Sequence, residues 1–144
     1  MKNRIQKLIL FLCGWLLPRK AVAVATRESI LGASDRIAGF VDVPEWGGRV
    51  HIATLTVAQR AKFLDALGRL GSSADPVEQG IKYFRSQVEL IASGVVDADS
   101  QPMFTDQDVE RLTTKSPAIV GRVYDQIVRL NGFSVVATEE AAKN

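Results

Sequence analysis

A short stretch rich in β-branched residues, proline and glycine constrains the fold of this chain most strongly. Residues 40–43 and 49–53 are rich in β-branched and aromatic residues, which favours strands, and Pro44 and Gly47-Gly48 lie between them. Proline lacks a backbone donor and closes the first strand, while the glycines supply the positive φ angles that a hairpin turn often needs. The sequence therefore predicts an antiparallel hairpin near the start of the folded region.

Three helical segments are predicted after the hairpin. Thr56 and Gln59 have the spacing of a capping box, which opens a helix that runs to about Leu70. A second helix is expected over residues 76–93 and a third over residues 117–130, each with proline in its first turn. Apolar residues at helical spacing are expected to form the core. They are Phe63, Leu64, Leu67 and Leu70 in the first helix, Ile81, Tyr83, Phe84, Val88, Leu90 and Ile91 in the second, and Ile119, Val120, Val123, Tyr124, Ile127 and Leu130 in the third.

Shorter elements complete the expected fold. Residues 26–33 can form a short helix with Thr26 as its N-cap, and Thr105 is placed to cap another. Residues 95–96 and 103–104 flank a polar turn, which predicts a second small hairpin. The expected class is therefore α+β: a small, mainly α-helical domain with an N-terminal β-hairpin and a second small hairpin.

The charges of the chain are unevenly distributed. The net charge of the 144 residues is +2, but residues 1–23 carry five basic side chains and no acidic one. The remaining residues hold 13 basic and 16 acidic side chains, a net charge of −3. Nucleic-acid binding calls for a basic face, so the composition of the body argues against it. A single cysteine, Cys13, and a single histidine, His51, exclude an intrachain disulfide and a metal site built from several such residues.

Residues 1–23 form an apolar, basic leader that differs from the rest of the chain. A basic start, the apolar run of residues 8–17 and a small-residue site near Ala23 are the parts of a secretory signal. The run is shorter than the roughly 20 residues that an ordinary membrane span needs. Three interpretations stay open: a start-site artefact with translation from Val24, which we favour, a true signal or membrane anchor, and a packed helix. The domain proper is expected over residues 24–133, followed by a flexible tail over residues 134–144.

The acidic loop that follows the second helix has a partial likeness to a calcium-binding loop. Asp97, Asp99, Gln101 and Asp108 fall at positions one, three, five and twelve of an EF-hand. Position six, which needs glycine for a sharp turn, is Pro102. A turn followed by a helix cap explains the same residues, so no metal or other cofactor is expected. The chain also lacks the spacings of a phosphate-binding loop, a serine nucleophile or a zinc-protease helix, which argues against an enzyme.

The turn of the first hairpin is the candidate partner-binding site. It contains Pro44, Glu45, Trp46 and Arg49. An exposed tryptophan at a turn is a frequent interface anchor. Trp46 could instead fold back and cover the valines of the hairpin, an interpretation that the sequence favours slightly.

Three stretches together resemble a known family. They are residues 41–50, Val-Asp-Val-Pro-Glu-Trp-Gly-Gly-Arg-Val, leading into Leu55-Thr56; residues 95–110, with Val-Asp-Ala-Asp followed by Met-Phe-Thr-Asp-Gln-Asp-Val-Glu; and Leu130-Asn-Gly at the end of the last helix. In these motifs, over roughly residues 25–144, the chain resembles the tail assembly chaperones of long-tailed bacteriophages, in their short form without a frameshifted second domain.

The resemblance implies a function without catalytic residues. Such a chaperone would bind the tape measure protein, keep that long helical polymer soluble and help to recruit tail tube subunits, and a homo-oligomer is a further expectation. It would act in the host cytoplasm and be absent from the mature virion. Two alternatives stay open: a minor structural tail protein that remains in the virion, and an exported or membrane-tethered protein whose leader is genuine.

Overall fold

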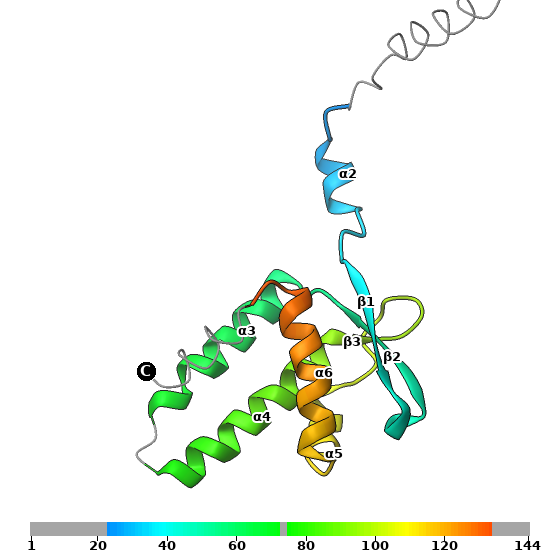
Figure 1. Cartoon of the computed structure of the whole chain (residues 1–144). Coiled ribbons are helices and arrows are strands. Elements are labelled where there is room, and N and C mark those ends of the chain that lie inside the picture. The colour runs from blue at the N-terminus through cyan, green and yellow to red at the C-terminus, as the bar shows by residue number, and fades with distance from the viewer. Residues whose placement is uncertain (1–22, 73–74, 134–144) are drawn as a thin grey trace, which may run out of the picture. The chain divides into compact units, whose positions relative to one another are not determined.

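A computed structural model describes residues 23–72 and 75–133 (Figure 1). The chain divides after Ser34 into two units, residues 1–34 and 35–144. In the first unit, helix α2 (Arg27–Leu31) begins after Thr26, whose hydroxyl accepts a hydrogen bond from the Ser29 N–H, and it buries no side chain. This confirms the short helix predicted there. The predicted leader and flexible tail fall almost entirely outside the described residues, and the domain boundary at residue 24 stays a prediction.

The second unit opens with the predicted hairpin. Strand β1 (Ala38–Val43) pairs antiparallel with strand β2 (Gly48–Ala53). The turn between them is a short 3₁₀ segment, η1 (Pro44–Trp46), followed by two glycines with φ angles of 101° and 146°. Only glycine adopts such angles readily, so the Gly47-Gly48 pair explains where the chain reverses.

The second predicted hairpin is wrong in its outer arm. Strand β3 (Val95–Val96) pairs with β2 and completes a three-stranded antiparallel sheet in the order β1-β2-β3. Residues 103–104 form no strand; the return segment makes one isolated bridge between Val96 and Pro102, with a hydrogen bond from the Met103 N–H to the Val95 carbonyl. A second hydrogen bond, from the Asp97 N–H to the Gln101 carbonyl, flanks the bridge on its other side, so the return segment forms a tight turn beside β3 and not a strand.

The helices begin where the sequence predicts them. Helix α3 (Val57–Gly68) starts with the Thr56–Gln59 capping box and is followed by the 3₁₀ segment η2 (Leu70–Ser72). Helix α4 (Pro76–Gly94) starts at Pro76, where the Asp75 carboxylate accepts a hydrogen bond from the Val77 N–H. Each start therefore uses the local capping chemistry that its sequence encodes.

The remaining helices follow the acidic loop. They are the 3₁₀ segment η3 (Asp106–Asp108), helix α5 (Val109–Leu112) and helix α6 (Pro117–Leu130). Helix α6 lies against α4 and against β1 and β2, so it joins the helical layer to the sheet (Figure 1). Its end is fixed by Asn131, whose side chain accepts a hydrogen bond from the Leu55 N–H at 2.7 Å and donates one to the Ile127 carbonyl at 2.8 Å. No helix within residues 23–72 and 75–133 is long and apolar enough to cross a membrane.

The core lies between helices α3, α4 and α6 and the inner face of the sheet. Its buried members are Val41, Val43, Ile52, Phe63, Leu67, Leu70, Val88, Leu90, Ile91, Ala92, Val95, Val109, Leu112, Ile119, Val120, Val123, Tyr124, Ile127 and Val128. Tyr83 and Leu130, predicted for the core, are partly buried and pack against it.

Three residues predicted for the core are exposed. Leu64 in α3 is 48% exposed, and Ile81 and Phe84 in α4 are 64% and 51% exposed. Leu64 is one position from Phe63 and so turns away from the face that packs. The first turns of α4 extend beyond the segment that α6 covers (Figure 1). Helix α4 has 19 residues against 14 in α6, a difference of about 7.5 Å at 1.5 Å per residue.

Candidate partner-binding surface

The hairpin turn is attached to helix α6 by a charged pair. The Arg122 guanidinium donates two hydrogen bonds of 3.0 Å to the Glu45 carboxylate. These bonds, together with a backbone hydrogen bond within Glu45, hold the pKa of this carboxyl below its ordinary value. Two parallel bonds fix orientation as well as distance, so the 3₁₀ turn has a defined position over α6.

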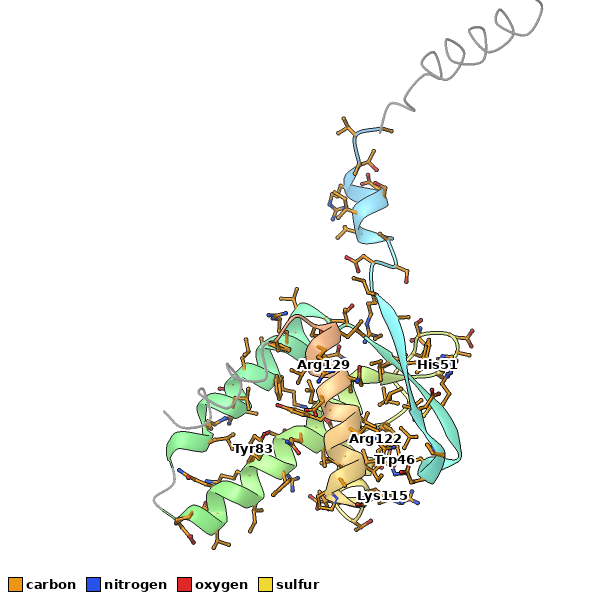
Figure 2. All side chains as sticks on the ribbon, in the orientation of Figure 1. Trp46, His51, Tyr83, Lys115, Arg122 and Arg129 are labelled. Atoms are coloured by element: carbon orange, nitrogen blue, oxygen red, sulfur yellow. The ribbon has the colours of Figure 1, made fainter. Side chains whose placement is uncertain are left out.

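Trp46 lies half-buried between the turn and α6, close to Arg122 in Figure 2. It packs against the core and lines a hollow of about 370 Å³, the Trp46 hollow, with Val50, Met103 and Phe104. The packing suits the predicted role of a cover over the hairpin. The open side of the hollow leaves part of the ring accessible to a partner, so the choice between cover and anchor stays a prediction.

The four predicted site residues do not share one face. Pro44 starts the 3₁₀ turn, and its carbonyl accepts the Gly47 N–H at 3.0 Å. The Arg49 Nε donates to Asp42 Oδ1 at 2.8 Å, and the guanidinium lies 4.0 Å from the centre of the Phe40 ring. This hydrogen bond lowers the pKa of Asp42 and stabilises a charged pair on the outer face of the sheet. The structure thus brings Glu45 and Trp46 together and separates them from Arg49, because alternate residues of β2 point to opposite faces.

A second concave surface runs along helix α4. This surface, the α4 groove, also measures about 370 Å³ and is lined mainly by Ile81, Phe84 and Val88 of α4, Leu112 of α5, Lys115 of the α5–α6 turn and Val120 of α6. The Trp46 hollow also contains Leu112 and Lys115 among its lining residues. The two concave surfaces therefore meet at the α5–α6 turn, where Figure 2 shows Lys115 below Trp46.

Sequence reasoning missed the α4 groove. Ile81 and Phe84 continue the same helical period as the buried Val88, and their spacing alone assigned them to the core. Lys115 carries no local signal, since it lies in a polar stretch between the short helix α5 and helix α6. Only the packing of α5 and α6 against the middle of α4 brings these residues to one surface.

The acidic loop has the predicted turn and helix cap. The Asp97 carboxylate accepts hydrogen bonds of 2.9 Å from the Asp99 and Gln101 N–H groups. The Asp108 carboxylate accepts from the N–H of Thr105 at 2.9 Å and from its hydroxyl at 2.8 Å, and these bonds lower the pKa of Asp108. In the part of the chain that the structure describes, no group of three or more His, Cys, Asp or Glu residues could hold a metal ion.

The comparisons with known proteins agree with the resemblance in the motifs. The family model described as phage tail assembly chaperone matches residues 25–144. Among solved structures, the tail assembly chaperone of bacteriophage HK97 has a similar fold, with a TM-score of 0.54 and 21% sequence identity over 66% of this chain and 85% of that chain. No curated protein sequence matches the chain.

The family match begins two residues after the expected end of the leader and includes the hairpin, the acidic loop and all the helices of the second unit. It covers far more than half of the sequence. The chain therefore belongs to the phage tail assembly chaperone family.

Proposed function

We propose that this chain binds the tape measure protein of its phage, keeps it soluble and helps to recruit tail tube subunits around it. The observation that carries the proposal is the family match over residues 25–144. The two concave apolar surfaces support it, because a protein that shields apolar segments of another needs such surfaces of its own. We propose that the chain acts in the host cytoplasm and is absent from the finished virion.

The proposed mechanism is reversible covering rather than catalysis. A long helical client exposes apolar stripes that associate with one another unless they are covered. The family match suggests a non-enzymatic role for this chain. We propose that binding requires neither nucleotide nor metal ion and that the client is released when tube subunits replace the chaperone.

Co-expression tests the function directly. The cognate tape measure protein is expressed with and without the full chain, and its soluble fraction is measured, with an unrelated coiled-coil protein as the control client. We expect the soluble fraction of the tape measure protein to rise and that of the control client to stay unchanged. An unchanged soluble fraction of the tape measure protein contradicts the proposal. Stoichiometric amounts of the chain in purified virions would instead support a structural tail protein.

A substitution of Trp46 separates its two roles in this assay. If the ring anchors the client, Trp46→Ala lowers client solubility and leaves the melting temperature nearly unchanged. If the ring covers the hairpin, Trp46→Ala lowers the melting temperature. The loss in the free energy of unfolding should then be smaller than the about 3–5 kcal/mol that truncation of a fully buried tryptophan costs. Trp46→Phe is the matched control, because it keeps an aromatic cover with less surface.

A further inference from the structure

The first half of helix α4 presents an apolar ridge to solvent. Ile81 and Phe84 are 64% and 51% exposed, and Val88 continues their row into the floor of the α4 groove. Residues three and four apart lie on one face of a helix, so these three side chains form a continuous line. The line from Ile81 to Val88 is about 10 Å long, which matches two turns of a helix laid along it.

The opposite wall of the α4 groove is formed by α5 and α6. Leu112 and Val120 are buried at its base, and Pro117 at the start of α6 lies beside them. An apolar floor between two walls is the shape that receives one face of an amphipathic helix. The exposed apolar side chains of α4 are therefore part of a groove that can hold a helix.

The charges around the groove are not balanced. The carboxylate in its lining is engaged, because Glu110 pairs with Arg85 at 2.6 Å. Arg85 also pairs with Glu89, at 3.4 Å. The other cation of the lining, Lys115, is exposed and has no ion pair within the described part of the chain. The rim at the α5–α6 turn therefore has excess positive charge.

We propose that the α4 groove binds one amphipathic helix of the tape measure protein, with the apolar stripe of that helix on Ile81, Phe84 and Val88 and an acidic side chain of the same helix against Lys115. This inference rests on the proposed function and adds the surface and the chemistry of the bound segment. The client segment is about two helical turns with an apolar stripe flanked by Asp or Glu.

The charge at the rim also distinguishes this occupant from a second copy of the chain. In a symmetric dimer the same patch lies on both sides of the interface. Pairing the groove with itself would bring two rims, each with an excess positive charge at Lys115, to one interface. Like charges across an interface are unfavourable, whereas an acidic partner neutralises them.

The first experiment removes the apolar ridge in the full chain. Ile81→Gln/Phe84→Gln is co-expressed with the tagged cognate tape measure protein, and soluble client and co-purified chain are measured. The control is Leu64→Gln on α3, because Leu64 is 48% exposed and lines neither concave surface. We expect soluble client to fall to its level without the chaperone in the double variant and to stay at the wild-type level in the control. The melting temperature of each purified variant checks its folding, and Ile81→Gln alone replaces the double variant if that variant unfolds.

The second experiment reverses the charge of Lys115. Lys115→Glu is compared with Arg129→Glu, which changes an exposed cation at the other end of α6 (Figure 2). With the tagged tape measure protein held on a resin, less of the wild-type chaperone should stay bound as the salt concentration of the wash rises. Salt screens the ion pair between Lys115 and the acidic side chain of the client. At low salt, the dissociation constant of the Lys115→Glu complex should be about fivefold or more above that of the wild type. The dissociation constant of the Arg129→Glu complex should equal that of the wild type.

The outcomes separate the groove from the function. If the wild type solubilises the tape measure protein and the double variant does so equally well, the groove assignment is overturned and the proposed function stands. If the wild type itself fails, both are overturned. A wild-type oligomer that dissociates in the double variant without client, measured by light scattering, shows that a second copy occupies the groove and also overturns the assignment.

Discussion

The two halves of helix α4 continue one apolar row but differ in what covers them. In the second half, Val88 and Ile91 are almost fully buried between α3, α6 and β3. In the first half, Ile81 and Phe84 belong to the same row and are mostly exposed. The comparison teaches that helical spacing marks an apolar face, whereas the length and position of neighbouring helices determine how much of that face becomes core.

The close packing of the second half has a specific cause. Gly94 is the last residue of α4, and a Cβ atom placed there would lie 2.9 Å from Ile127 Cγ2. Ile127 is fully buried in α6, so it has little room to move. The absence of a side chain at Gly94 therefore allows α6 to approach α4 at this end. At Gly80, in the first half, such a Cβ would meet no atom within 4 Å beyond its own stretch of helix.

The largest expected effect comes from truncating the same residue type in each half. Ile91→Ala should lower the free energy of unfolding by about 2–5 kcal/mol, because it leaves a cavity among buried side chains. Ile81→Ala should change the free energy of unfolding by no more than about 0.5 kcal/mol, because the site is largely solvated. Chemical denaturation of both variants measures the difference. Similar costs at the two positions would contradict the division of α4 into a packed half and an exposed half.

A smaller effect of opposite sign is expected for the two glycines. Gly94→Ala should destabilise the fold by about 1–3 kcal/mol, because the new methyl group overpacks against Ile127. Gly80→Ala should stabilise it by up to about 1 kcal/mol, since alanine has the higher helix propensity and meets no neighbour. Thermal melting curves of the two variants provide the test. A stabilising Gly94→Ala would mean that α4 and α6 are less closely packed at this end.

The smallest effect concerns the charged pair that holds the hairpin turn near the Trp46 hollow. The folded-state pKa of Glu45 lies below its ordinary value of 4.5, so the pair contributes stability above that pH and loses it as the pH falls through the folded pKa. Stability should therefore fall less steeply below pH 4.5 in Glu45→Gln than in the wild type. Arg122→Gln should flatten the acid limb in the same way, because it removes the partner. An acid limb that neither substitution changes would show that the pair adds nothing measurable to folding.

Local chemistry made much of the fold predictable. The Thr56–Gln59 capping box, the prolines that open α4 and α6, and the two glycines after Trp46 act within a few residues, so their effects can be read from the sequence. Only the outer arm of the second hairpin was predicted wrongly: residues 103–104 form no strand, and β3 pairs instead with β2, some 45 residues earlier in the chain. Local patterns contain no information about such a partner.

The candidate surface was predictable only in part. Glu45 and Trp46 were identified from their place in a turn, but Arg49 lies on the other face of the sheet, and the α4 groove was assigned to the core. Its walls come from α4, α5 and α6, and its rim depends on which charges find partners at a distance. Arg85, for example, pairs with Glu110, which is 25 residues away in the sequence.

The sequence by itself determined the family, the hairpin, the helix starts and the apolar face of each helix, because motif, turn and capping signals are local and because periodicity is a property of the chain. Only the tertiary structure decided that β3 joins the first hairpin and that α6 covers the second half of α4 while leaving the first half open. The physical reason is that burial and charge pairing are set by segments far apart in sequence. The close approach of Gly94 to Ile127, for example, follows from how α6 crosses α4.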